Sequence, residues 1–120
     1  MSLESNTLAS RNGKLIERSI AQYIGVPLNG QPVDAMLDDK PLEIKSCQQY
    51  ITDMGSARNR RSGRFVFNEE QHQYMLENNG IYALVVRTGD IVIHTRLRKA
   101  SLISGITGRA SVKPWPMVIQ

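Results

Sequence analysis

The feature that most constrains the fold is a pair of short apolar segments separated by a polar turn. Apolar residues alternate with other residues on both sides of the sequence Asp38-Asp39-Lys40-Pro41. An alternating pattern that is interrupted by turn residues is typical of two β-strands in a hairpin. The sequence therefore predicts two adjoining strands, which bring Asp34 close to the triplet Glu43-Ile44-Lys45.

Three polar side chains of this hairpin are predicted to meet at one place. Successive side chains of a strand alternate between faces, so Glu43 and Lys45 project to one side while Ile44 points into the core. Asp34 on the first strand can then meet Glu43 across the pair. Two carboxylates suit Mg²⁺ or Mn²⁺, and a neighbouring lysine can position a water and stabilise charge on a phosphate. The predicted chemistry is phosphodiester hydrolysis; the alternative is an ordinary solvated hairpin.

The composition limits the classes of protein to which this chain can belong, but it does not indicate a particular function. A chain of 120 residues is long enough for one domain with its own core, so we expect a single domain over residues 1–120. It has no 20-residue apolar span and no secretory signal, which predicts a cytoplasmic protein without membrane association. Cys47 is the single cysteine and is expected to be buried. His72 and His94 lack metal-ligand spacing and are expected on the surface or on a strand.

Basic residues concentrate in one stretch after the second predicted strand. Four arginines fall within seven positions, among glycine, serine and asparagine residues that have no helical or strand period: Arg58, Arg60, Arg61 and Arg64. The whole chain has a net charge of +4. The arginine stretch predicts an exposed cationic loop that binds phosphates beside the metal site. The alternative is a solvated loop that only favours solubility.

The rest of the chain predicts two helices, two more strands and a tail. In sequence order we expect a helix over 10–24, the two hairpin strands, a helix from Asn68 to Asn78, strands over 81–86 and 91–95, and an irregular basic tail over 96–120. Asn68 is the expected N-cap of the second helix, with Tyr74, Met75 and Gln71 facing inward. Glu17 on the first helix either keeps its carboxylate in water or supplies a third carboxylate to the metal.

This order of elements resembles the PD-(D/E)xK nucleases, the restriction-endonuclease-like superfamily, over about residues 11–95. The segment Lys14-Leu15-Ile16-Glu17-Arg18 is similar to the first-helix motif of archaeal-type Holliday junction resolvases. The segment Phe65 to Val86 is similar both to those resolvases and to virus-type replication-repair nucleases. The resemblance implies an α/β fold, in which a mixed β-sheet is flanked by helices in the order αββαββ, and it implies metal-dependent DNA cleavage.

The resemblance also implies a role for each matching residue. Asp34 and Glu43 match the metal-binding carboxylates, and Lys45 matches the catalytic lysine. Glu17 matches the helix glutamate that assists the metal, and Gln71 matches a helix glutamine of the replication-repair group. The implied metal set is Asp34, Glu43, Ile44 and Glu17. The residues expected to contact nucleic acid are Arg18, Arg58, Arg60, Arg61 and Arg64.

The leading hypothesis is a Mg²⁺-dependent or Mn²⁺-dependent DNA endonuclease that acts on branched DNA. A homodimer is expected, because a two-fold pair of small catalytic domains can cut both strands. A sequence-specific restriction or homing endonuclease is the alternative within the same chemistry. A non-catalytic DNA-binding module would instead explain the arginine stretch and the basic balance alone, and a structural or interaction domain is the remaining possibility.

Overall fold

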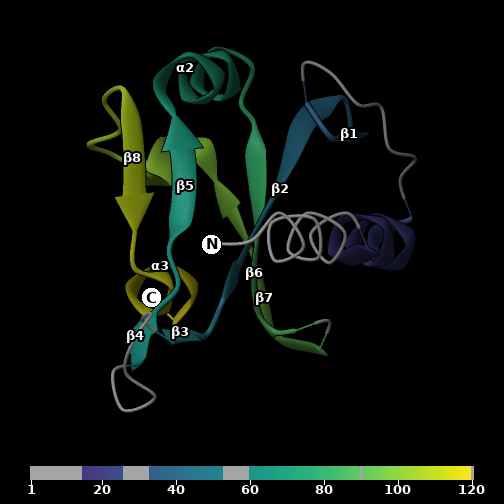
Figure 1. The fold of residues 1–120 in the computed structure, drawn as a ribbon. Coiled ribbons are helices and arrows are strands. Elements are labelled where there is room, and N and C mark those ends of the chain that lie inside the picture. The colour runs from purple at the N-terminus through teal and green to yellow at the C-terminus, as the bar shows by residue number, and fades with distance from the viewer. Residues whose placement is uncertain (1–14, 26–32, 53–59, 90, 120) are drawn as a thin grey trace.

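A four-stranded mixed sheet lies at the centre of the molecule (Figure 1). The computed structural model describes residues 15–25, 33–52, 60–89 and 91–119. The strands of the sheet are β1 (Ala35–Leu37), β2 (Lys40–Gln48), β6 (Ile81–Thr88) and β7 (Ile91–Lys99), in the order β1-β2-β6-β7. β2 and β6 run parallel, and the two outer pairs are antiparallel. β6 is buried from Tyr82 to Arg87, so the predicted buried central strand is confirmed.

The turn between β1 and β2 sets the register of the hairpin. The pair Asp38-Asp39 has positive φ angles of 50° and 65°, and a two-residue type I′ turn requires positive φ at both central positions. The strands then pair with Ala35 opposite Leu42. Asp34 and Glu43 follow one position further out, and are therefore held opposite each other.

α2 (Glu69–Glu77) begins and ends where the sequence predicts. The side-chain oxygen of Asn68 accepts hydrogen bonds from the backbone N–H groups of Glu70 at 2.9 Å and Gln71 at 3.2 Å. This cap satisfies two of the donors that the first turn of a helix leaves unpaired. At the other end Asn79 adopts a φ of 55°, a left-handed conformation that asparagine tolerates better than most residues.

His72 is buried in the core, so its predicted place at the surface or on a strand is wrong. Its Nδ1 lies 2.8 Å from the hydroxyl of Tyr82, and its Nε2 lies 2.9 Å from the backbone oxygen of Ile103. A carbonyl can only accept, so Nε2 carries the proton and the Tyr82 hydroxyl donates to Nδ1. Both partners are distant in sequence, and helical periodicity could not reveal them. Of the three residues predicted to face inward, Met75 is buried, and Tyr74 and Gln71 are half-buried.

Two ribbons of two strands each lie outside the central sheet (Figure 1). One pairs β3 (Tyr50–Thr52) with β4 (Arg60–Ser62), and the other pairs β5 (Phe65–Asn68) with β8 (Arg109–Val112). The predicted cationic loop is therefore wrong in part, because its residues 60–62 form a strand. Gly63 follows β4 and permits a close approach, since a Cβ there would lie 2.1 Å from the backbone oxygen of Gln48.

The predicted irregular tail is also wrong. After β7 ends at Lys99, the chain forms the short 3₁₀-helix η1 (Ala100–Leu102), then β8, and then the helix α3 (Pro114–Ile119). Side chains of β7 donate to carbonyls in the last turn of α3: His94 and Arg96 to Val118, and Arg98 to Met117. Basic groups stabilise the C-terminal end of a helix, where carbonyls lack partners within the helix. These contacts join segments that a local pattern cannot connect.

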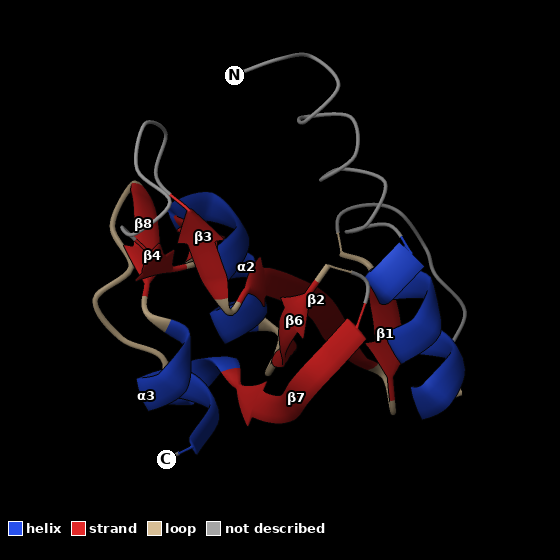
Figure 2. Cartoon of the chain, turned by 60° about the horizontal axis from the view of Figure 1, so that its bottom comes forward, coloured by secondary structure: helices blue, strands red, loops and turns tan. Residues whose placement is uncertain are grey.

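Helices cover both faces of the central sheet (Figure 2). The helix that the structure describes over residues 15–24 packs Ile16 and Ile20 against Ile44 of β2 and Val85 of β6. This helix precedes Gly25, which has a φ of 87°, and glycine commonly ends a helix in that conformation. None of the helices within the described ranges is long and apolar enough to cross a membrane.

The opposite face of the sheet carries the larger part of the core. α2, α3 and the β5–β8 ribbon lie on this side, around the fully buried side chains of Phe65, Phe67 and Tyr82. The molecule is thus a mixed α/β protein with a mixed sheet flanked by helices, as the restriction-endonuclease-like resemblance implies. The predicted order αββαββ is present, with β3, β4 and β5 inserted before α2 and with η1, β8 and α3 following β7.

Candidate active site

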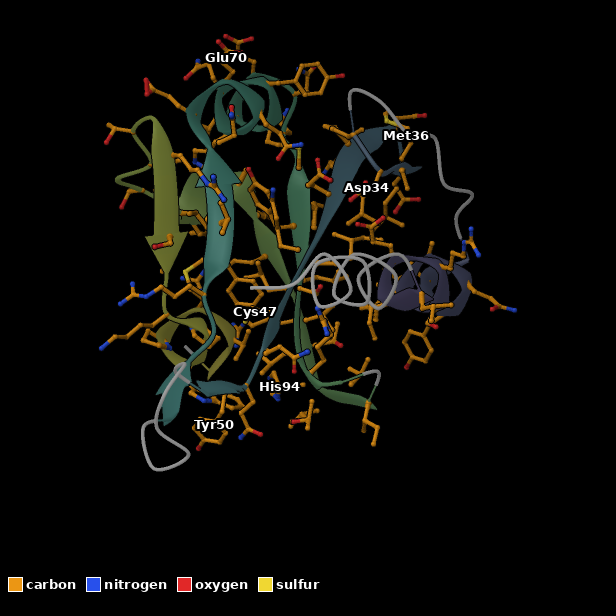
Figure 3. The ribbon with its side chains drawn as sticks, in the orientation of Figure 1. Asp34, Met36, Cys47, Tyr50, Glu70 and His94 are labelled. Atoms are coloured by element: carbon orange, nitrogen blue, oxygen red, sulfur yellow. The ribbon has the colours of Figure 1, made fainter. Side chains whose placement is uncertain are left out.

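Asp34 and Glu43 lie together on the face of the sheet that also carries α2. Figure 3 shows Asp34 between α2 and the N-terminal helix. Its Oδ2 accepts a hydrogen bond from the backbone N–H of Ile44 at 2.8 Å, and its carboxyl group is also hydrogen-bonded to that of Glu43. The side chain of Glu43 is only 6% exposed. A buried carboxyl group and a half-buried one therefore lie next to each other.

The pKa of Glu43 is raised from 4.5 to about 9. Burial is the largest cause, followed by the hydrogen bond to Asp34 and the negative charge of Asp34, with a smaller contribution from Glu17. The ammonium of Lys45 acts in the opposite direction. A second negative charge at short range raises the pKa of a carboxyl group, because the two ionised groups repel each other. A bound cation offsets this repulsion. The electrostatics of the site thus favour either a proton or a cation between the carboxylates.

Lys45 and Glu43 are linked through Gln71 of α2. The ammonium of Lys45 donates to the side-chain oxygen of Gln71 at 2.9 Å, and the side-chain amide of Gln71 donates to Oε2 of Glu43. The amide group thus connects two residues of one strand across the sheet face. The resemblance implies that Gln71 belongs to the site, and the structure brings its side chain into contact with Glu43 and Lys45 of the Glu-x-Lys triplet.

Two neighbouring residues of β5, Phe67 and Asn68, interact with Lys45 and Gln71 respectively. The Lys45 ammonium lies 5.8 Å from the centre of the Phe67 ring, within the range of a cation–π interaction. The Phe67 ring in turn meets the Tyr82 ring edge-on at 5.2 Å. Asn68 accepts from the backbone N–H of Gln71 as the N-cap of α2. Local sequence predicts no such role for Phe67, although its alternation with Phe65 indicates that it faces inward.

The other residues of the implied metal set occupy different positions. Glu17 is half-buried on the N-terminal helix, and its charge acts on Glu43. The side chain of Ile44 is buried in the core on the opposite face of the sheet, as alternation predicts, so only its backbone borders the site. Arg18 is exposed on the N-terminal helix.

The donor set fits a small cation that keeps part of its water shell. Within the described ranges, no three His, Cys, Asp or Glu side chains form a group that could hold a metal by themselves. The site instead offers the adjoining oxygens of Asp34 and Glu43, with Glu17 contributing its charge. Mg²⁺ is usually bound by one or two carboxylates together with waters and substrate phosphate. Hard oxygen ligands also exclude the thiolate sites that select softer metals.

The arginine stretch is described only in part. Arg58 lies outside the described residues, and the side chains of Arg60 and Arg61 in β4 do too. Arg64 is exposed and donates to the backbone oxygen of Ser111 in β8 at 3.4 Å. The predicted contact between these arginines and nucleic acid therefore stays a prediction.

Comparison with known proteins places the chain in a family. No curated protein and no solved structure matches it. Residues 3–109 match the family model described as a PD-(D/E)XK nuclease superfamily domain. This match covers most of the chain and includes each of the four residues Asp34, Glu43, Lys45 and Gln71. The chain therefore belongs to the PD-(D/E)XK nuclease superfamily.

Proposed function

We propose that the protein is a Mg²⁺-dependent DNA endonuclease that acts on branched DNA. The observation that carries the proposal is the hydrogen-bonded cluster of Lys45, Gln71, Glu43 and Asp34 on one face of the sheet. A structural hairpin has no need of a buried carboxyl group next to a second, half-buried one, because burying the charge costs free energy. Membership of the nuclease superfamily supports hydrolysis of a phosphodiester as the use of this cluster.

Each residue of the cluster has a distinct part in the proposed reaction. Asp34 and Glu43 would hold a divalent metal ion, which when bound supplies Lewis-acid activation of water and of the phosphate. The ammonium of Lys45 would donate to the attacking water or to a phosphate oxygen and stabilise the charge that develops there. Gln71 would orient Lys45, because its amide accepts from that ammonium. Such orientation keeps the reacting groups in place before the substrate arrives.

Cleavage assays on several DNA forms test this proposal. The purified protein is incubated with a four-way junction, a flap, a linear duplex and a closed circular duplex, in Mg²⁺ or in a chelator. We expect cuts within the junction or flap strands in Mg²⁺ and none in the chelator. Sequence-dependent cutting of the linear and circular duplexes would favour a restriction or homing enzyme. Inertness toward all four in Mg²⁺ and in Mn²⁺ would contradict the nuclease proposal.

A homodimer is the second part of the proposal, and an apolar surface at the sheet edge supports it. Tyr23 is 91% exposed and Leu97 of the edge strand β7 is 47% exposed. They border a groove of about 550 Å³ that is lined by Ser19, Ile20, Tyr23, Ile24, Val92, Thr95 and Leu97. Together with the exposed Ile91, these side chains form an apolar surface of the kind that a second copy of the chain could bury.

Sedimentation velocity checks the dimer. We expect the wild-type protein to sediment as a dimer and Leu97→Glu to sediment as a monomer, because a charge in the centre of an apolar interface stays unpaired. Leu76→Glu is the matched control, since Leu76 is a similarly exposed leucine on α2. A wild-type monomer at micromolar concentration, or equal effects of both variants, would contradict this interface.

A further inference from the structure

The β5–β8 ribbon has one face in the core and one face in solvent. Phe65 and Phe67 of β5 point inward and are fully buried. Val66 and Asn68 between them are exposed. Because β5 pairs with β8 in register, Val66 lies opposite Ser111 of β8, and that residue is exposed as well. The ribbon thus presents a second, outer surface, which the proposed active site does not use.

Three cations lie along this outer surface. Arg109 pairs with Asn68 at one end of the ribbon. Phe65 pairs with Val112, so Arg64 and Lys113 follow as the next opposing residues at the other end. All three cations are exposed, and the three are here called the ribbon cations. At about 3.3 Å per residue, the four steps from Asn68 to Arg64 separate the two ends by roughly 13 Å.

The ribbon cations are available to an external anion. The guanidinium of Arg64 reaches across β8 and donates to the Ser111 carbonyl, which is a neutral partner. Arg109 and Lys113 have no carboxylate partner within the described part of the chain. The only large apolar side chain exposed on the described part of the ribbon is Val66, so the surface lacks the apolar area that a protein partner would bury.

This surface adjoins the candidate active site. Asn68, the partner of Arg109, also accepts from the N–H of Gln71. Phe67, the neighbour of Asn68, lies under the Lys45 ammonium. Asn68 thus connects the Arg109 end of the ribbon to the first turn of α2, which carries Gln71. Phe67 faces inward toward Lys45, so the cations lie on the other face of the ribbon and extend away from this end.

We propose that the outer face of the β5–β8 ribbon binds backbone phosphates of the nucleic acid that flank the cleaved bond. The inference rests on the proposed nuclease function and adds Arg109 and Lys113 as contact residues. Lysine and arginine side chains that neutralise phosphates release condensed counterions, and this release drives binding at low salt. Such contacts position the substrate without reading its sequence.

Acidic residues at one end of the ribbon predict unequal contributions. Glu69 and Glu70 in the first turn of α2 line a hollow together with Asn68, Gln73 and Gly108, next to Arg109. Their carboxylates repel a phosphate near Arg109, whereas no residue of this hollow lies at the end that carries Arg64 and Lys113. The latter two cations therefore contribute more to affinity than Arg109.

Salt-dependent binding tests the inference without any cleavage. A fluorescent four-way junction is titrated with protein in a chelator at several concentrations of KCl, and affinity is plotted against salt on logarithmic axes. We expect Arg64→Gln with Lys113→Gln to bind roughly tenfold more weakly at moderate salt, with a slope that is smaller by about 2. The matched control is Lys40→Gln with Lys99→Gln, which removes the same charge beside the C-terminal end of α2 and should change the slope little.

A gain of binding provides a readout that misfolding cannot imitate. Glu70→Gln removes a carboxylate beside Arg109 and should tighten binding severalfold, with a steeper salt dependence. Equal slopes for the two double variants, or no gain from Glu70→Gln, would overturn the assignment of this surface even if the protein cleaves DNA. A protein that binds through the ribbon but never cleaves would instead overturn the proposed nuclease function and leave the surface assigned.

Discussion

We expect Glu43→Gln to abolish DNA cleavage and also to stabilise the metal-free protein at alkaline pH. The substitution keeps the shape of the side chain and removes the charge that would hold the metal. A metal ion contributes several kcal/mol to the transition state, so its loss corresponds to about 10³-fold or more in rate. Cleavage of labelled junction DNA by matched concentrations of wild type and variant measures this loss.

The stability effect follows from the raised pKa of Glu43. Its folded-state pKa of about 9 lies above the ordinary value of 4.5. The contribution of the protonated carboxyl group to stability is therefore fully present below pH 4.5 and is lost as pH rises through 9. In a chelator, the unfolding temperature of the wild type should fall relative to that of Glu43→Gln over this range. Scanning calorimetry at a series of pH values measures the difference.

Metal addition and a control substitution separate this effect from a general one. Mg²⁺ binds the ionised carboxylates of the folded protein and should raise the unfolding temperature of the wild type at pH 8, but not that of Glu43→Gln. Glu77→Gln is the control, because Glu77 is exposed on α2 and should leave both cleavage and the pH dependence unchanged. A wild type whose stability relative to Glu43→Gln does not change with pH would contradict the assigned burial of Glu43 beside Asp34.

Lys45→Met is expected to lower the cleavage rate by about 10²- to 10³-fold, the usual effect of removing one group that stabilises developing charge. Methionine keeps most of the aliphatic stem, which lies beside Phe67, and loses the ammonium. The variant should still bind junction DNA in a chelator with an affinity close to that of the wild type. Single-turnover cleavage rates, together with binding by fluorescence anisotropy, separate the chemical step from substrate affinity.

Two further substitutions, Lys45→Arg and Lys40→Met, test whether cleavage needs an ammonium group at this particular place. Lys45→Arg keeps the positive charge, but its planar guanidinium cannot reproduce the donation of a compact ammonium to Gln71. We expect it to remain at least tenfold below the wild type. Lys40→Met, on the same strand but exposed, should cleave at the wild-type rate. Full activity of Lys45→Met would remove the residue from the proposed mechanism.

The hairpin illustrates how much of the site local pattern can predict. Alternation along the two strands is enough to send Glu43 and Lys45 to one face and to bring Asp34 near them. The exact pairing of Asp34 with Glu43 follows from a turn of only two residues, whereas the polar stretch Asp38-Asp39-Lys40-Pro41 indicates a longer turn and its last two residues belong to β2. The reason is geometric, because side chains on a strand repeat every two residues and a two-residue turn permits one register. The cap at Asn68 is predicted for a similar reason, since the residues that satisfy it are three positions away at most.

The arrangement of the remaining parts depends on contacts between distant segments. Gln71 reaches Glu43 and Lys45 only because α2 packs on the face of the sheet toward which both of these side chains project. His72 becomes a core residue through Tyr82 and the backbone of Ile103. No local pattern contains these partners, so the sequence predicted His72 at the surface or on a strand.

Short-range periodicity thus predicted the four strands of the central sheet, the ends of α2 and the polar residues of the hairpin, because each depends on neighbours within a few positions. The C-terminal segment is the clearest contrast. Its residues have little periodicity of their own, and β8 exists because β5 offers it a partner, while α3 is held by basic side chains of β7. Hydrogen bonds and burial between segments up to 47 positions apart, from Phe65 to Val112, decided that part of the fold, and with it the surface that carries three cations on the β5–β8 ribbon.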